Sequence, residues 1–346
     1  MFEGKTPVIG STFSGVKDPT GQRIITLLGY DSFYYLFTRS AEDIFTFTEQ
    51  IARQEAPFFV LWSGDSGADE AIKTLLQYQQ QPVKTAILLM KGGTANNLAG
   101  ILRLSDVHEA ARIARGLASK RLSLDDYVKP TDVIKINFDA NQTHYTATSF
   151  NIGLISQVCY YSERKATSLL DGFLKDKGLK TIIYGANAVR GAFTYKPIKA
   201  EITYEFCSGE KKTTLFSDLF NINVVNGEKH AAITKWNPKG LPCDGELEVA
   251  CFKSMSLFRM SLIVGRMVLN RHTHITPHKG KDGYNPYGVN YAEKVKGLEM
   301  RVLDNGGNDP LYVEAGGNAW PIEKPEMPIK AEIIPGAIKF VYGKKK

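Results

Sequence analysis

The chain of 346 residues contains only four cysteines, and they lie far apart in the sequence. No two of them form a CxxC pair, which argues against a zinc ribbon and favours a reducing compartment. Long apolar runs are also absent, since none approaches the roughly 18 residues that a membrane-spanning helix needs. The N-terminal stretch MFEGKTPVIGSTF has no basic lead before a long apolar core, so it does not resemble a signal peptide. We therefore expect a cytoplasmic protein whose membrane contact, if it has one, is peripheral.

Two common nucleotide-binding motifs are missing as well. The sequence contains no GxGxxG, so a dinucleotide-binding fold gains little support. The stretch Gly10–Lys17 (GSTFSGVK) nearly spells a P-loop, but its lysine comes one residue late and no Ser or Thr follows it. A P-loop lysine must lie at the N-terminus of a helix to reach the terminal phosphates. Gly10–Lys17 is therefore not a P-loop of the usual kind.

The charge balance favours anionic partners without choosing among them. The chain has 43 basic and 36 acidic residues, a formal net charge of +7. Its basic and aromatic residues are not organised into an RNA- or DNA-reading motif, so we expect no nucleic-acid partner. The histidines of RHTHITPH (residues 271–278) match no standard zinc spacing. The sequence does not decide between a monomer and a homodimer.

The first 128 residues alternate strand and helix patterns. Runs rich in β-branched and aromatic residues predict strands at Pro7–Thr12, Ser32–Thr38, Pro57–Trp62 and Lys84–Met90. Apolar residues at three- and four-residue spacing predict helices at Ala41–Gln54, Ala68–Gln80 and Asp106–Lys120. This alternation predicts an α/β domain, in which a doubly wound, mainly parallel sheet carries helices on both faces. Ligands of such sheets bind beyond the carboxyl ends of the strands.

From about Asp132 onwards, short strand patterns follow one another. Helical patterns interrupt them only near Ser162–Asp176 and Leu179–Ala192. This change predicts a C-terminal β-rich sandwich domain with antiparallel strands. We place the boundary at Val128–Pro130, which gives domains of residues 1–128 and 129–346. Whether the last strand, in IIPGAIKFVYG, returns to the first domain stays open.

Small residues follow three of the N-terminal strands. The third strand ends in Ser63–Gly67 (SGDSG) and the fourth in Gly92–Asn97 (GGTANN), and each of these loops leads into a helix. Glycine lets backbone N–H groups come close to a phosphate, and the helix dipole favours the negative charge. Together with Gly10–Lys17, these loops predict a nucleotide at the carboxyl edge of the sheet.

Asp65 is unusual in such a loop because a carboxylate repels phosphate. The residue suits a position that faces Mg²⁺ or a substrate hydroxyl group. The alternative is an N-cap for the helix predicted to begin near Ala68. The spacing permits both interpretations.

These loops resemble those of the diacylglycerol kinase/sphingosine kinase catalytic family, the DAGK-like lipid kinases. The family's GGDGT-type loop is similar to Ser63–Glu70, and its GTANN-L-A segment matches Gly93–Ala99 residue for residue. Leu241–Val249 (LPCDGELEV) resembles a further segment, P…DG-L-V, and the resemblance covers most of the chain. It implies a two-domain fold of the NAD kinase/diacylglycerol kinase type. In that fold, ATP with Mg²⁺ binds in a cleft and the β-rich domain accepts a lipid at a membrane surface.

The resemblance also implies roles for individual residues. The residues that would contact ATP are Ser11, Ser14, Gly15, Gly64, Asp65, Ser66, Gly67, Gly93, Thr94 and Asn96. Asp65 would organise the metal or act as the general base. A structural Mg²⁺ would be held by the Asp244 carboxylate and the carbonyl groups of Leu241 and Glu246, and a site made only of oxygen ligands suits that ion.

One departure bears directly on activity. Bacterial members of the family carry a late D-G-E motif whose aspartate is the proposed base, and the matching stretch here, Tyr312–Pro321 (YVEAGGNAWP), has lost both acids of the motif. Glu314 lies two residues upstream of Gly316 and is the candidate substitute, although a solvated strand glutamate is the alternative. Loss of a general base typically lowers the rate by about 10² to 10⁴.

The predicted function is that of an ATP-dependent lipid kinase, which transfers the γ-phosphate to the hydroxyl group of a diacylglycerol- or sphingosine-like lipid. The first alternative is a catalytically impaired relative that binds nucleotide or lipid as a sensor or scaffold. The second is a kinase of a soluble substrate that resembles NAD kinase.

Overall fold

The chain folds into two compact units in the computed structural model. The first unit comprises Met1–Val133, Tyr145–Ala147 and Ile334–Lys346, and the second comprises Ile134–His144 and Thr148–Ile333. The structure describes residues 2–11, 19–79, 83–92, 96–139, 142–164, 187, 189–191, 193–227, 229–230, 234–235, 241–256, 285, 288–308 and 310–344. Each unit has a hydrophobic core of its own.

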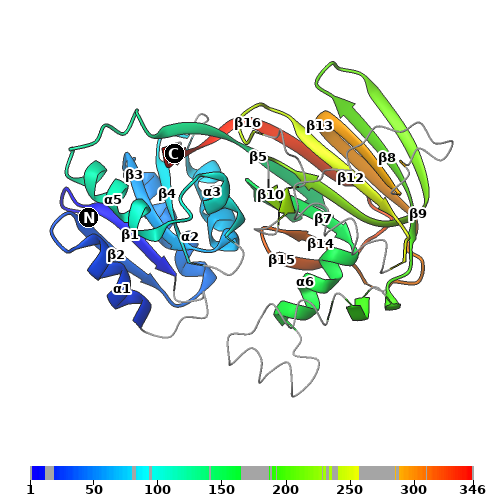
Figure 1. Cartoon of the computed structure of the whole chain (residues 1–346), viewed down its shortest axis with the longest axis horizontal. Coiled ribbons are helices and arrows are strands. Elements are labelled where there is room, and N and C mark those ends of the chain that lie inside the picture. The colour runs from blue at the N-terminus through cyan, green and yellow to red at the C-terminus, as the bar shows by residue number, and fades with distance from the viewer. Residues whose placement is uncertain are drawn as a thin grey trace. The chain divides into compact units, whose positions relative to one another are not determined.

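The first unit is a parallel sheet with helices on both faces (Figure 1). Its elements are β1 (Thr6–Ser11), α1 (Pro19–Leu28), β2 (Phe33–Thr38), α2 (Ala41–Arg53), β3 (Phe58–Ser63), α3 (Asp65–Tyr78), β4 (Ala86–Lys91), α4 (Asn97–Ile101) and α5 (Val107–Ala118). The strands follow the order β4-β3-β1-β2, and every neighbouring pair is parallel. Helix α2 contacts α3, and α1 contacts α5. Right-handed crossovers place these two pairs on opposite faces, which confirms the predicted doubly wound sheet.

The second unit is rich in antiparallel strands, as predicted. Its elements are β7 (Ser149–Gly153), α6 (Leu154–Arg164), β8 (Ile198–Phe206), β9 (Lys211–Val225), β10 (Lys229–His230), β11 (Thr234–Lys235), β12 (Leu247–Lys253), β13 (Val289–Asp304), β14 (Leu311–Ala315) and β15 (Asn318–Ile322). Three more strands have residues in both units: β5 (Val128–Phe138), β6 (Gln142–Thr146) and β16 (Ile329–Val341).

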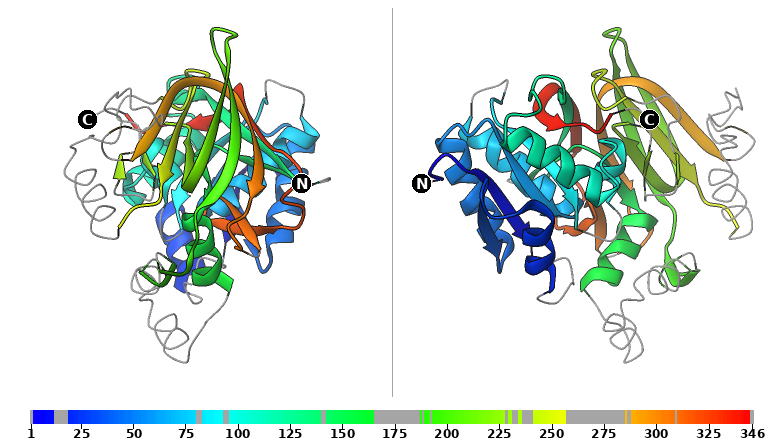
Figure 2. Two further views of the ribbon diagram at one scale, coloured as in Figure 1. Left: turned by 90° about the vertical axis from the view of Figure 1, so that its right-hand side faces the viewer. Right: turned by 60° about the vertical axis from the view of Figure 1, so that its left-hand side comes forward.

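Two long, curved strands organise the second unit (Figure 2). One half of β9 pairs with β8 and the other half with β12. Strand β13 divides in the same way between β12 and β8. Strands β9 and β13 each pair with both β8 and β12, and together they enclose a hydrophobic core. One face of β7, β12 and β14 also contributes side chains to this core. Alternate residues of these strands point to opposite faces, so their other face is free to carry polar side chains.

Strand β16 joins β4 of the first unit in parallel, where Lys339 is paired with Ala86. The earlier part of the same strand pairs with β13 in the second unit, in antiparallel register, where Gly297 lies opposite Glu332. The C-terminal strand thus contributes to the sheets of both units.

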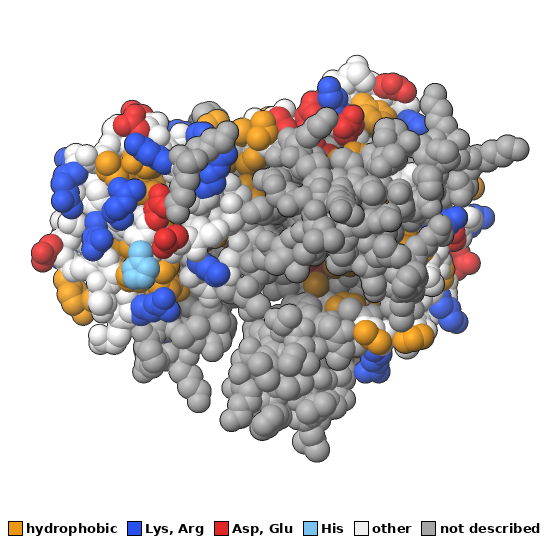
Figure 3. Space-filling view, viewed as in Figure 1, with side chains coloured by type: hydrophobic (Ala, Val, Ile, Leu, Met, Phe, Trp, Pro, Cys, Tyr) orange, Lys and Arg blue, Asp and Glu red, His pale blue; other side chains and the backbone are white. Residues whose placement is uncertain are grey.

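Some elements differ from the sequence-based expectations. Helix α3 begins at Asp65 rather than near Ala68, and α1 and β13 were not predicted. Most of the two helices expected between Ser162 and Ala192, and the histidine-rich RHTHITPH, lie outside the described residues. Among the residues that the structure does describe, no helix is long and apolar enough to cross a membrane. Basic and acidic side chains are interspersed over the described surface of the first unit (Figure 3).

Gly153, at the end of β7, tests the packing of the second unit. Its φ of +115° lies where L side chains are strained, and an added Cβ would lie 2.6 Å from the Phe220 carbonyl oxygen and 3.0 Å from the Cα of Asn221. We expect Gly153→Ala to lower the free energy of unfolding by roughly 2–3 kcal/mol, measured by urea denaturation. The matched control is Gly21→Ala in α1, where the nearest atom would be 3.5 Å away. That change should be neutral or stabilise by up to about 1 kcal/mol. Equal changes in the free energy of unfolding at Gly153 and Gly21 would contradict the close packing around Gly153.

Candidate nucleotide-binding site

The loops after β1, β3 and β4 leave the sheet at one edge. In the parallel register, Gly10 lies beside Trp62 and Ser63 beside Lys91, so the three strands end at nearly the same level. The Gly92 N–H also donates a hydrogen bond of 3.0 Å to the Ser63 carbonyl oxygen. The structure therefore brings together Ser11, at the end of β1, with the loop of Gly64–Gly67. Four other residues expected to bind ATP, Ser14, Gly15, Gly93 and Thr94, lie outside the described residues.

Two glycines at this edge are required by close packing. A Cβ on Gly92 would lie 2.6 Å from Trp62 Cδ1 and 2.9 Å from the Ser63 nitrogen. A Cβ on Gly67 would lie 1.9 Å from Ser63 Oγ, which itself is buried against the start of α3. The contacts of Ser63 thus give a reason for both glycines that is independent of any phosphate.

The N-terminus of α3 opens at the same edge. Gly64 is its N-cap and contributes no side-chain hydrogen bond, while Ser66 is exposed in the first turn. The first N–H groups of a helix have no partner within the helix, and they carry partial positive charge. A phosphate group could be bound by such N–H groups.

Asp65 is the first residue of α3, and its carboxylate binds the start of another helix. Its Oδ2 accepts a hydrogen bond from the Asn97 N–H at 2.9 Å, and its Oδ1 accepts one from the Leu98 N–H at 3.0 Å. The side chain is buried, with 7% of the residue exposed. Burial raises the pKa of the Asp65 carboxyl, and the two N–H donors act in the opposite direction. The interpretation as an N-cap of its own helix is wrong, because Gly64 takes that position and Asp65 caps α4 instead.

The start of α4 depends on this contact. Asn96 is the N-cap of α4 and has a left-handed backbone, with φ of 50° and ψ of 44°. Its side chain makes no capping hydrogen bond to the helix. The Asp65 carboxylate supplies that missing cap and so connects the loop after β3 to the loop after β4. The predicted roles of Asp65 in metal binding or proton transfer stay predictions.

Glu314, the other predicted catalytic acid, belongs to the second unit and is buried, with only 4% exposed. The interpretation as a solvated glutamate is therefore wrong. One carboxylate oxygen accepts the Gly317 N–H at 2.6 Å and the other accepts the amide of Asn151. Gly316 and Gly317, with φ of 56° and 87°, form the turn between β14 and β15. Glu314 thus fixes the turn that takes the place of the family's D-G-E motif.

The Glu314 carboxylate ends a row of buried polar side chains that crosses three strands. Asn151 lies opposite both Glu314 and Asn223 in the strand register. The Asn223 amide donates to Asn151 Oδ1 at 2.6 Å, and the Asn151 amide donates to Glu314. On the same strand, Asn221 Oδ1 accepts the Ile155 N–H at the start of α6. Sequence reasoning missed this row, although polar residues at alternate positions of β9 were its signal.

The loop predicted to hold a structural metal folds around one carboxylate. The two oxygens of Asp244 accept the Leu241 N–H at 3.3 Å and the Glu246 N–H at 3.1 Å. Gly245 has a left-handed φ of 73°, and the Cys207 thiol lies 3.8 Å from its carbonyl oxygen. The carboxylate therefore lies next to the backbone of both residues whose carbonyls were predicted as ligands. The contacts that the structure shows here are to N–H groups, so the predicted Mg²⁺ ligands stay a prediction.

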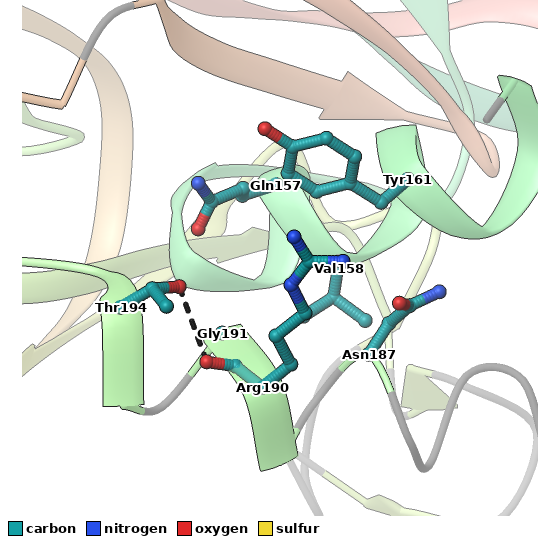
Figure 4. Close-up of a pocket in the computed structure, with 7 residues that line it drawn as sticks. All are labelled: Gln157, Val158, Tyr161, Asn187, Arg190, Gly191 and Thr194. Carbon is teal, nitrogen blue, oxygen red and sulfur yellow. Dashed lines mark hydrogen bonds between the residues drawn. The ribbon is translucent and has the colours of Figure 1, made fainter. Parts of the chain in front are cut away.

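Two hollows in the second unit are less suited to a ligand. One lies between α6 and residues 187–194 (Figure 4), and its volume of about 10 Å³ is at the limit for a single water molecule. Thr194 donates a hydrogen bond to the Arg190 carbonyl oxygen at its rim. The other, of about 300 Å³, lies over β8 and β13 and is lined by paired charges, such as Glu299 with Lys330 at 3.3 Å.

The comparisons with known proteins bear on the fold and the family. No protein-family model matches the chain. A curated relative from Shewanella frigidimarina (strain NCIMB 400), named "Probable lipid kinase YegS-like", is 23% identical over 302 residues, which cover 87% of this chain and 81% of the relative. A crystal structure of a Bacillus anthracis str. Sterne protein assigned as a diacylglycerol kinase has a TM-score of 0.67 and 18% identity, covering 99% of this chain and 98% of that chain. Yeast NADH kinase has a TM-score of 0.50 and 9% identity over 98% of this chain and 84% of that chain.

The fold is therefore that of the two-domain NAD kinase and diacylglycerol kinase class. Within that class, the chain resembles the DAGK-like lipid kinases in sequence as well as in fold, which confirms the resemblance that its Gly-rich loops indicate. The names of these relatives support an enzyme of the kinase class.

The buried row in the second unit predicts that Glu314 is important for stability. In Glu314→Gln, one acceptor oxygen becomes an NH₂ group that faces the Gly317 N–H or the Asn151 amide. We expect the free energy of unfolding to fall by about 1–3 kcal/mol in urea denaturation, because a buried donor loses its acceptor. Glu332→Gln removes an exposed carboxylate that pairs with Lys135 and should change stability by no more than about 0.5 kcal/mol. Equal losses of stability in the two variants would show that Glu314 does not stabilise the row of buried polar side chains.

Proposed function

We propose that the protein is an ATP-dependent lipid kinase that transfers the γ-phosphate of ATP to a hydroxyl group of a diacylglycerol- or sphingosine-like lipid. The observation that carries the proposal is the common edge at which β1, β3 and β4 end, with α3 and α4 starting beside it. Ligands of parallel α/β sheets bind at such an edge. The lipid kinase name of the curated relative supports the substrate class.

Phosphoryl transfer depends mainly on positioning and on electrostatic stabilisation. In the proposal, the first N–H groups of α3 and the loop that leads into α4 bind the phosphates of ATP. Ser66 is exposed in the first turn of α3 and supplies a hydroxyl donor. Mg²⁺ bound with the nucleotide would neutralise the charge that develops on the transferred group. The β-rich unit would accept the lipid at a membrane surface.

A specific observation favours a second candidate, a catalytically impaired relative that binds nucleotide or lipid. The turn of Gly316 and Gly317 carries no acid, and both oxygens of the nearby Glu314 carboxylate already accept hydrogen bonds. A general base contributes about 10² to 10⁴ to a rate, so its loss would leave slow transfer rather than none.

Transfer of radiolabelled γ-phosphate into a total lipid extract tests the proposal. We expect a labelled lipid product that requires both MgATP and the protein, because the proposed acceptor is a lipid hydroxyl. A thermal shift with MgATP but no labelled lipid would support the impaired relative. The absence of both the shift and the label would contradict the kinase and an impaired relative that binds nucleotide.

The loop around Asp244 predicts a second, structural Mg²⁺ site. In the absence of nucleotide, Mg²⁺ at ten times its Kd should stabilise the protein by about 1.4 kcal/mol, seen as a rise of a few degrees in Tm. Asp244→Asn should remove this rise because the carboxylate is the only charged ligand proposed. The matched control is Asp304→Asn, since Asp304 also accepts a backbone N–H two residues later, that of Gly306. Loss of the rise in both variants, or in neither, would contradict a site at Asp244.

A further inference from the structure

The Asp65 carboxylate has both of its oxygens engaged by consecutive N–H groups of another element. The donors, Asn97 and Leu98, are the first two residues of α4 and lie more than thirty positions along the chain. Distances of 2.9 Å and 3.0 Å fall in the normal range for N–H···O hydrogen bonds, and a charged acceptor makes such bonds stronger than neutral ones. The contact joins the first residue of α3 to the first two residues of α4. Because it consists of two hydrogen bonds, it restrains both the position and the orientation of α4.

Helix α4 needs an external cap. It contains five residues, and isolated helices of this length are not stable in water. Its N-cap residue, Asn96, is left-handed and provides no side-chain hydrogen bond to the helix. At its other end, the Leu102 carbonyl oxygen accepts the Gly343 N–H at 2.9 Å. Asp65 therefore supplies the side-chain acceptor that caps the start of α4, which Asn96 does not supply.

The position of Asp65 also explains why an acidic residue is found here. The residue begins α3 and its oxygens meet the start of α4, so the carboxylate lies at the positive ends of two helices. An aspartate is suited to this place because it can accept both N–H groups. An asparagine has only one amide oxygen, and its NH₂ group would face the second N–H donor.

We infer that Asp65 is a positioning residue, which holds the start of α4 and with it Asn96, a predicted ATP contact, and that it does not take the proton of the acceptor hydroxyl. The consequence for ATP rests on the proposed function, whereas the contact with α4 does not. Burial alone would suit a base by raising the pKa of Asp65, so the experiment must separate the two roles.

The first measurement is amide hydrogen exchange in the nucleotide-free protein. We expect Asp65→Asn to speed exchange at Asn97 and Leu98 by about tenfold or more, because one N–H loses its acceptor. The control is Asp106→Ala: Asp106 caps α5 through the N–H groups of His108 and Glu109, away from the predicted loops. That change should speed exchange at the start of α5 only. Unchanged exchange at Asn97 and Leu98 in Asp65→Asn would overturn the inference.

The second measurement separates positioning from proton transfer. Asp65→Asn should raise the Kd for MgATP by about tenfold while the rate at saturating ATP, and its pH profile, change little. Asp106→Ala should leave the Kd unchanged. An unchanged Kd with a rate lower by about 10² to 10⁴, and with the acidic limb of the pH profile lost, would make Asp65 the base. If the wild-type protein binds no ATP, the proposed function fails, and the exchange result still decides the contact with α4.

A second variant covers the case in which Asp65→Asn does not fold. Asp65→Glu keeps a carboxylate but extends it by one methylene, which displaces it from the two N–H donors. Faster exchange at Asn97 and Leu98 with weaker MgATP binding would support positioning. Retained exchange protection with a reduced rate would contradict it.

Discussion

The parallel register of β1, β3 and β4 is the constraint on which the candidate site depends. Because these strands end at nearly the same level, the loops that follow them meet at one edge, although they come from separate parts of the chain. The close packing of Gly67 and Gly92 around Ser63 fixes two of these loops against the sheet. The common edge is thus a consequence of how the sheet is built.

Buried carboxylates in both units bind backbone N–H groups where the chain changes direction. Asp65 holds the start of α4, and Glu314 holds the turn at Gly317. The family resemblance assigns Asp65 to catalysis, and Glu314 is the candidate substitute for the missing acid of the D-G-E motif. Their contacts indicate that this chain uses them to position loops, and phosphoryl transfer itself relies mainly on positioning and charge neutralisation.

The sequence predicts the local features well and the long-range ones poorly. The four N-terminal strands lie within two residues of their predicted bounds, because each is a short apolar run. Strand β13 was missed because lysines and glutamates interrupt its apolar alternation. The contact of Asp65 with Leu98 could not be predicted, since no local pattern links residues so far apart. Burial of Glu314 was missed for the same reason, as its partner Asn151 lies 163 positions away.

The most direct test of the account is the change in amide hydrogen exchange when MgATP is added to the wild-type protein. We predict slower exchange at Gly64–Gly67 and at Asn96–Leu98, the two described segments that follow β3 and β4. The half of β9 that pairs with β8 should not change, because it lies in the β-rich unit. Protection confined to other segments, or no change at saturating MgATP, would contradict a nucleotide site at this edge of the sheet.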